Sequence, residues 1–304
     1  MKLVVDNVYI VKPLDLSVPD CCVYMVDTKS EDGLILIDVG TNFEPIQNIE
    51  KEGFALKNIK HCLITHGHID HYGACFKLKE HNKDIIFYAH ELDAEVIEQE
   101  ISAPYLARLY PDYKNKNIRI TRKIVTDGEL LKFGDLEFRC IHIPGHTPGS
   151  VAYLLELEGK SILFAGDLPG TVINNQGGNL EAYLNSMQKL QKLDIDIICE
   201  GHEHPIYPAE KAQKFIKGYM ELNEKLNYVV LENPSDIKSL LELAEVSKEL
   251  EFYENVVDFS NYALELDPDN NQAKELIREA EKHNPVKMEW IKNLIERASN
   301  QENG

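Results

Sequence analysis

The sequence lacks the features that mark membrane proteins and disulfide-rich secreted proteins. No apolar run approaches the roughly 20 residues that a membrane-spanning helix needs. The first ten residues carry Lys2 and Asp6 within their apolar stretch, unlike a signal peptide. None of the six cysteines forms a Cys-x-x-Cys pair, so reduced, buried thiols are expected in place of a disulfide framework or a thiolate site. We therefore predict a cytoplasmic protein with no membrane partner.

Basic charge is also scarce. The chain has a net charge of −19, and its densest basic stretch, around residues 114–123, reads as the solvated face of a strand. An acidic surface repels phosphate backbones, which disfavours nucleic acid as a partner. The composition thus points to a small-molecule substrate.

The chain divides into a region of mixed strands and helices and an all-helical region. The 304 residues suit one large domain followed by a smaller one, and we place them at 1–208 and 209–304. Short β-branched runs predict strands at 3–12, 22–27, 34–38, 62–64, 85–89, 118–125, 136–143, 151–156, 161–164 and 195–199. Apolar residues at helical spacing predict helices at 44–52, 73–81, 91–99 and 180–193. This order favours two mixed sheets covered by helices.

Beyond Pro208 only helices are expected, at 209–228, 235–250, 253–266, 270–283 and 286–299, with Ser235 and Asp269 as candidate N-caps. Residues 235–283 resemble one and a half tetratricopeptide-type repeats, on the strength of Leu243-Ala244 and the run Ala263-Leu264-Glu265-Leu266-Asp267-Pro268. A lone repeat cannot bury its own apolar face. We therefore expect it to pack on the first domain, on a second copy of the chain or on a protein partner.

Three imidazoles and a carboxylate crowd into the segment Thr65-His66-Gly67-His68-Ile69-Asp70-His71. The segment directly follows the apolar strand Cys62-Leu63-Ile64, so a strand ending in a tight turn can aim several side chains at one point. Neutral imidazole and carboxylate are preferred ligands of zinc, iron and manganese. The alternative is that these are surface histidines of a loop without a metal. That interpretation would suit a single histidine, but it suits three histidines and an aspartate at this spacing less well.

Three later segments repeat this chemistry. They are Pro144-Gly145-His146-Thr147-Pro148-Gly149, Gly166-Asp167 and Gly201-His202-Glu203-His204, and each places a His or Asp after a strand with Gly directly before it. Four strand ends that present such side chains at one edge indicate a shared site.

These motifs resemble the metallo-β-lactamase superfamily, in the hydrolase branch typified by glyoxalase II-like enzymes. The resemblance covers residues 1 to about 205 and rests on His-x-His-x-Asp-His, Pro-Gly-His-Thr-Pro-Gly, Gly-Asp and Gly-His-Glu in the family order. It implies an α+β fold, a four-layer αββα sandwich with metals at one edge of the sheets, followed here by a small all-α region.

The resemblance also implies a ligand set for two divalent ions. One ion would be bound by His66, His68 and His146, the other by Asp70, His71 and His202, and Asp167 would bridge them. His204 competes with His202, which is preferred because it directly follows Gly201. Zinc is the default ion, and iron or manganese are alternatives.

A binuclear site of this kind implies hydrolysis. A hydroxide that bridges the metals would attack a carbonyl carbon, with Asp70 orienting it or taking its proton as well as ligating. Each metal-binding imidazole also needs a hydrogen-bond partner at its other ring nitrogen, which fixes the tautomer of the ring. Asp38, at the end of its strand, is the first candidate for that role, although it could equally be a turn-capping carboxylate; Thr65 and Thr147 are weaker candidates.

The substrate is less defined by the sequence. We expect an ester, thioester or lactone. The alternatives are a phosphodiesterase or ribonuclease of the same superfamily, and a metal-binding scaffold that acts through its helices. The loop 168–178 is polar and Gly-rich, and the C-terminal region is acidic, which disfavours a true glutathione thioesterase. Candidate pocket residues are Tyr72, Tyr105, Tyr110, Thr171, Asn174, Asn175 and His204.

Overall fold

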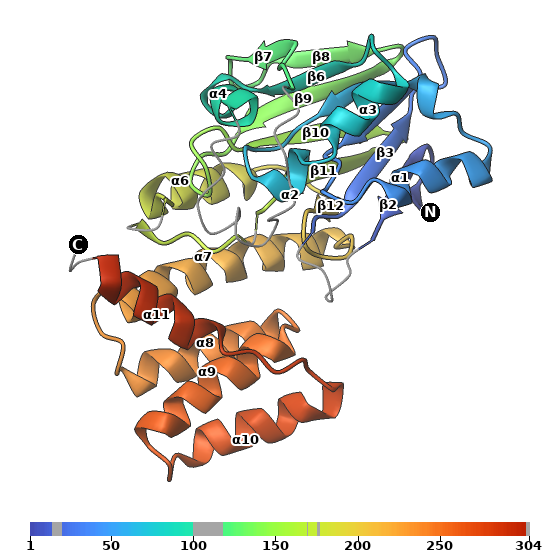
Figure 1. The fold of residues 1–304 in the computed structure, drawn as a ribbon. Helices are drawn as coiled ribbons and strands as arrows, with labels where there is room; N and C mark the ends of the chain where they lie inside the picture. Colours follow the sequence, from blue (N-terminus) through green and yellow to red (C-terminus); the bar gives the residue numbers. More distant parts are fainter. Residues whose placement is uncertain (14–19, 100–117, 169, 175–176, 302–304) are drawn as a thin grey trace. The chain divides into compact units, whose positions relative to one another are not determined.

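Two β-sheets form the framework of the first part of the chain. A computed structural model describes residues 1–13, 20–99, 118–168, 170–174 and 177–301. The larger sheet has the order β1-β2-β3-β4-β5-β6-β7, and the smaller one β12-β11-β10-β9-β8 (Figure 1). Their strands are β1 (Lys2–Val5), β2 (Val8–Lys12), β3 (Val23–Asp27), β4 (Leu34–Ile37), β5 (Ile59–Leu63), β6 (Ile86–His90), β7 (Arg122–Ile124), β8 (Leu130–Phe133), β9 (Leu136–His142), β10 (Val151–Leu157), β11 (Lys160–Gly166) and β12 (Ile197–Glu200).

An apolar core joins the two sheets face to face. Tyr24 and Ile35 from the larger sheet share one buried cluster with Phe138, Tyr153 and Phe164 from the smaller sheet. A second buried cluster lies between the larger sheet and its covering helices α1 (Glu44–Gln47), α3 (Cys75–His81) and α4 (Glu91–Gln99). The central strands β3 and β4 are buried on both faces, which explains their nearly continuous apolar sequences.

Parallel pairing brings the motif segments to one edge. In the larger sheet β5 pairs parallel with β4 and β6, and in the smaller sheet β12 pairs parallel with β11. The carboxyl ends of parallel strands meet at the same edge of a sheet, where α/β proteins commonly bind ligands. Asp38, the segment that begins at Thr65, Asp167 and His202 all follow such strand ends.

Several predicted elements differ from the observed ones. The predicted strand 3–12 is two strands, because Asn7 adopts a left-handed conformation, with a φ of 65°, and turns the chain between β1 and β2. The strand predicted over 118–125 is confined to β7, and β8 was not predicted. The helix predicted over 44–52 is α1 followed by a 3₁₀ helix at Asn48–Glu52. The short helix α2 (Ile69–Tyr72) lies inside the histidine motif.

The described part of the C-terminal region contains helices joined by short connections and no strand. It contains α7 (Ala209–Leu231), α8 (Ile237–Glu249), α9 (Tyr253–Leu266), α10 (Asn271–Ala280) and α11 (Trp290–Gln301). Among them α8 packs on α9, and α9 packs on α10 and α11. The predicted class, mixed α and β sheets followed by an all-helical region, is confirmed.

The chain forms two compact units. One comprises Met1–Gly170 and Leu193–Ala212, and the other comprises Thr171–Lys192 and Gln213–Gly304. The segment with α6 (Leu180–Leu190) therefore groups with the C-terminal helices, whereas the sequence prediction assigned it to the first domain.

No helix in the described ranges is both long enough and apolar enough to cross a membrane.

Candidate metal centre

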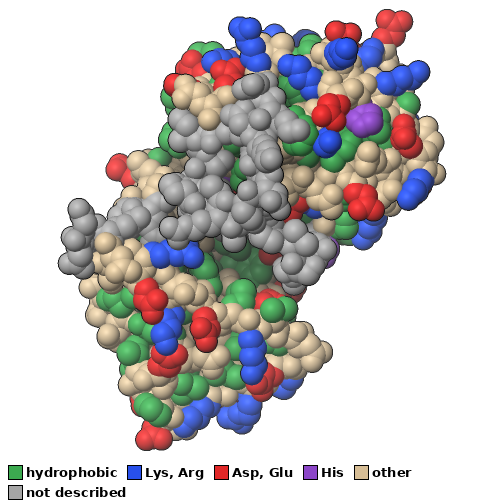
Figure 2. Space-filling view, viewed as in Figure 1, with side chains coloured by type: hydrophobic (Ala, Val, Ile, Leu, Met, Phe, Trp, Pro, Cys, Tyr) green, Lys and Arg blue, Asp and Glu red, His purple; other side chains and the backbone are tan. Residues whose placement is uncertain are grey.

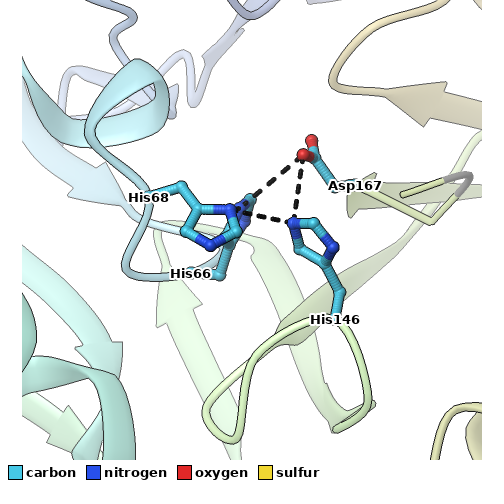
Figure 3. A group of neighbouring side chains, drawn as sticks. All are labelled: His66, His68, His146 and Asp167. Atoms are coloured by element: carbon cyan, nitrogen blue, oxygen red, sulfur yellow. Dashed lines mark hydrogen bonds and ion pairs between the residues drawn. The ribbon is translucent and has the colours of Figure 1, made fainter. Parts of the chain in front are cut away.

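Three imidazoles and one carboxylate converge on one point of the sheet-containing unit. His66 and His68 follow β5, His146 lies in the loop between β9 and β10, and Asp167 follows β11. Nδ1 of His68 lies 3.0 Å from Nε2 of His66 and 2.9 Å from Nε2 of His146. Asp167 Oδ2 lies 3.3 Å from Nε2 of His146 and 3.8 Å from Nε2 of His66. Figure 3 shows these side chains pointing toward one another.

A second group shares Asp167. Its other oxygen, Oδ1, lies 2.9 Å from Nε2 of His71 and 3.3 Å from Nε2 of His202. Asp70 Oδ2 lies 3.3 Å from Nε2 of His202 and 3.9 Å from Nε2 of His71. The structure thus brings together all seven residues predicted as ligands, in the two predicted groups.

Two imidazoles of the first group, those of His66 and His68, are held neutral by burial. Burial, reinforced by the charge of neighbouring histidines, lowers the pKa of His66 well below its ordinary value and that of His68 to about 3. Nδ1 of His68 faces Nε2 of His66 and Nε2 of His146 across 2.9–3.0 Å. A cation bound among these three nitrogens would accept a lone pair from each, as in metal sites built from neutral imidazoles.

The second group favours positive charge. Burial alone would lower the pKa values of His71 and His202, but the carboxylate of Asp167 outweighs it and holds both well above their ordinary value. Burial would raise the pKa of Asp167, yet His202 and His71 hold it well below its usual range. The carboxylates therefore stabilise cationic charge at this position.

The donor set fits divalent metal ions. Oδ1 of Asp70 is buried and accepts no hydrogen bond from the described residues. A buried carboxylate oxygen without a partner is costly, and metal coordination satisfies it. Imidazole nitrogens with carboxylate oxygens suit zinc, iron and manganese.

Asp38 and Thr65 orient two of these imidazoles. The Thr65 hydroxyl donates to Asp38 Oδ2 at 2.8 Å, and Nδ1 of His71 lies 2.8 Å from the same oxygen. Because its proton is committed to Asp38, the Thr65 hydroxyl accepts from Nδ1 of His66, 3.1 Å away. Both rings therefore carry a proton on Nδ1, and Nε2 is the atom that each turns toward the centre.

Thr147 contacts a carboxylate that the sequence interpretation missed. Its hydroxyl donates to Asp93 at 2.6 Å and lies 2.8 Å from the hydroxyl of Ser150. Asp93 lies in the first turn of α4 and is buried. Only its place in a helix beside the motif strands could have drawn attention to it in the sequence.

Glu200 is a second missed residue. It ends β12, is fully buried, and accepts a hydrogen bond from the backbone N–H of His202. Burial, with a contribution from Asp167, raises its pKa well above the ordinary value. A carboxylate at the end of the apolar run Ile197-Ile198-Cys199 was the available signal.

The residues suggested for the pocket wall lie in different environments. Tyr72 is fully buried in the cluster between the larger sheet and its helices, so it belongs to the core. His204 is exposed and lines a separate hollow of about 490 Å³ with Met1, Ile10 and Tyr207.

Other suggested residues lie in the 168–178 loop or beyond the described ranges. Thr171 and Asn174 are exposed and belong to the helical unit. Tyr105, Tyr110 and Asn175 lie outside the residues that the structure describes.

The fold and the clustered donors define a metal-dependent hydrolase of the αββα type. A family profile described as the metallo-beta-lactamase superfamily matches residues 19–202. The chain belongs to this superfamily.

Several proteins are similar to this chain in sequence over about three-fifths of its length. An uncharacterised protein of Aquifex aeolicus is 35% identical over 63% of this chain and 88% of its own length. The hydroxyacylglutathione hydrolase GloC of Haemophilus influenzae is 33% identical over 57% of this chain and 81% of its own. A probable metallo-hydrolase of Bacillus subtilis, YqgX, is 29% identical over 62% of this chain and 90% of its own length.

Solved structures support the fold. A B3 metallo-beta-lactamase with an active-site glutamic acid superposes with a TM-score of 0.58 at 22% identity, over 73% of this chain and 88% of its own. A metallo-beta-lactamase family protein of Thermus thermophilus superposes with a TM-score of 0.56 at 21% identity, over 79% of this chain and 88% of its own.

Proposed function

We propose that this chain uses two divalent metal ions to hydrolyse an ester, a thioester or a lactone. The observation that carries the proposal is the position of Asp167. Its Oδ2 faces His146 and His66, while its Oδ1 faces His71 and His202. A carboxylate between two donor groups suits a ligand that two ions share. Zinc is the default ion, with iron and manganese as alternatives.

The residues of the chain would divide the work. Two divalent ions bound in such a site supply an activated water and polarise the substrate carbonyl. Asp70 would orient this water and accept its proton, because its Oδ1 is buried and accepts no hydrogen bond from the described residues. Asp38 and Thr65 would keep His71 and His66 in the required tautomers through the contacts at Nδ1.

Among the three substrate classes, we place thioesters first. The relative GloC carries the name of an enzyme that hydrolyses hydroxyacylglutathione, in which the acyl group is bound through sulfur. The glutathione part itself is disfavoured here, because acidic residues outnumber basic ones in residues 221–304 and repel an anionic carrier. A thioester of a smaller or neutral thiol fits better.

A phosphodiesterase or ribonuclease is the main alternative within the superfamily. Such an enzyme attracts its polyanionic substrate with a basic surface. This chain has a net charge of −19, and the face shown in Figure 2 mixes acidic and basic side chains. Charge therefore favours the carbonyl substrate.

A substrate panel tests the proposal. The purified full chain is incubated with acyl thioesters, lactones, aryl esters and a phosphodiester, with and without a metal chelator and after zinc is restored. We expect thioester or lactone turnover that the chelator abolishes and zinc restores. Chelator-resistant turnover, or turnover of the phosphodiester alone, would contradict the proposal.

A further inference from the structure

Asp93 joins two loops that belong to different sheets. It lies in α4 and is 2% exposed, yet its hydrogen bonds come from outside that helix. Oδ2 accepts from the backbone N–H of Gly67 at 2.7 Å and from the Thr147 hydroxyl at 2.6 Å. Oδ1 accepts from the backbone N–H of Gly149 at 2.8 Å. Three donors compensate the burial of the charge.

These donors lie beside the imidazoles of the first group. Gly67 separates His66 from His68, and Thr147 directly follows His146. The two loops must be held in register for three ring nitrogens to converge at 2.9–3.0 Å. The hydrogen bonds of Asp93 tie the backbone of one loop to the backbone of the other.

Asp93 also explains a glycine of the second loop. A Cβ atom at Gly149 would lie 2.5 Å from Cγ of Asp93, closer than such atoms approach in proteins. At Gly67 the corresponding distance to Oδ2 is 3.3 Å. Glycine at 149 therefore lets the carboxylate reach the backbone N–H groups directly, which a larger residue would prevent.

We propose that Asp93 is a positioning residue that sets the spacing of His66, His68 and His146 and thereby their affinity for a divalent ion. It acts through the backbone of the two loops. The inference rests on the proposed function only in that these imidazoles bind metal, and it is independent of the substrate.

The test measures metal binding by the full chain. Asp93→Asn preserves the shape of the side chain but turns an amide N–H₂ toward at least one donor. Zinc affinity is measured by competition with a chromogenic chelator, and the visible spectrum of the cobalt-loaded protein reports the coordination geometry. We expect an affinity lowered by about 10- to 100-fold, the usual effect of disturbing groups that orient ligands, and an altered cobalt spectrum.

Asp196→Asn is the matched control. Asp196 accepts a hydrogen bond from the backbone N–H of Ser161 at 2.8 Å, near the start of β11, the strand that carries Asp167 at its other end. This variant keeps an amide oxygen that can accept from Ser161, so its zinc affinity and cobalt spectrum should match those of the wild type. If Asp93→Asn behaved in the same way, Asp93 would be a structural residue and the inference would be wrong.

A milder pair of variants decides the question if Asp93→Asn does not fold. Thr147→Val removes one donor to Asp93, and Thr147→Ser keeps the hydroxyl. Weaker zinc binding in the Val variant with near-normal binding in the Ser variant supports the inference, and equal binding in both overturns it. If the wild-type chain bound no ion, both the proposed function and this inference would be wrong. If the wild type bound ions and the variants bound them with equal affinity, this inference alone would be wrong.

Discussion

Asp38 shows how one residue supports the centre from outside it. The residue directly follows β4, has a φ of 56°, and is 2% exposed. Aspartate tolerates this left-handed conformation better than most residues. Its two oxygens accept from the backbone N–H and the hydroxyl of Thr65, and Nδ1 of His71 contacts Oδ2. The carboxylate therefore fixes both the strand end and an imidazole.

The variant Asp38→Asn tests this role. An amide cannot accept hydrogen bonds at both positions, so one of the Thr65 and His71 contacts is lost. We expect metal affinity to fall by about 10- to 100-fold. Metal content after dialysis against a weak chelator measures the effect. Retention of metal equal to that of wild type would show that the Asp38 carboxylate is a turn cap alone.

At the residue scale, spacing predicted the donors but not their supports. His66, His68, Asp70 and His71 are visible because unusual residue types crowd into a short segment. Asp93 gives no such signal, because an aspartate in an amphipathic helix looks the same whether it faces solvent or a buried loop. Tyr72 was placed in the pocket from its position beside the motif, but the turn of α2 directs it into the core.

At the scale of elements, α7 holds a loop in place. Its Asn223 accepts from the backbone N–H of Val172 at 2.8 Å, and its Asn227 donates to the carbonyl of Val172 and accepts from the N–H of Asn174 at 3.2 Å. Both asparagines are buried. The backbone of this loop is satisfied by side chains of a helix that begins more than thirty residues later.

Asn227→Leu tests the contribution of this contact. The substitution keeps a similar branched shape but leaves the buried carbonyl of Val172 and the N–H of Asn174 without these partners. We expect a loss of about 1–3 kcal/mol in the free energy of unfolding. Glu224→Gln, at an exposed position of the same helix, is the control and should stay within about 0.5 kcal/mol of wild type in chemical denaturation. Equal stability of the two variants would contradict the role assigned to Asn227.

Element types were easier to predict than element ends. Apolar runs and helical spacing located most strands and helices, because burial imposes these periods on the sequence. The N-caps of α8 and α10 are Asp236 and Asn270, each one residue beyond the predicted Ser235 and Asp269. Adjacent residues that are equally good caps leave the choice to backbone geometry. The loop 172–174 could not be paired with α7 from the sequence, since amide contacts of this kind have no period.

At the scale of the whole molecule, the two units raise separate questions. The sheet-containing unit carries the metal donors, and the match to the superfamily profile ends at residue 202. The helical unit leaves Leu266, Val286 and Met288 partly exposed. The resemblance to tetratricopeptide repeats and a partner for these helices stay predictions. Light scattering of the full chain tests whether the partner is a second copy of this chain: a dimer supports that prediction, and a monomer limits the partner to a different protein.

We expect the seven donors to bind two divalent ions on which hydrolysis depends. The most direct test counts metal ions per chain by elemental analysis in the wild type and in His66→Ala, with thioester hydrolysis measured on the same samples. We expect about two ions per wild-type chain and, in His66→Ala, the loss of at least one ion together with hydrolysis. Two ions retained by His66→Ala, or full hydrolysis without metal, would contradict it.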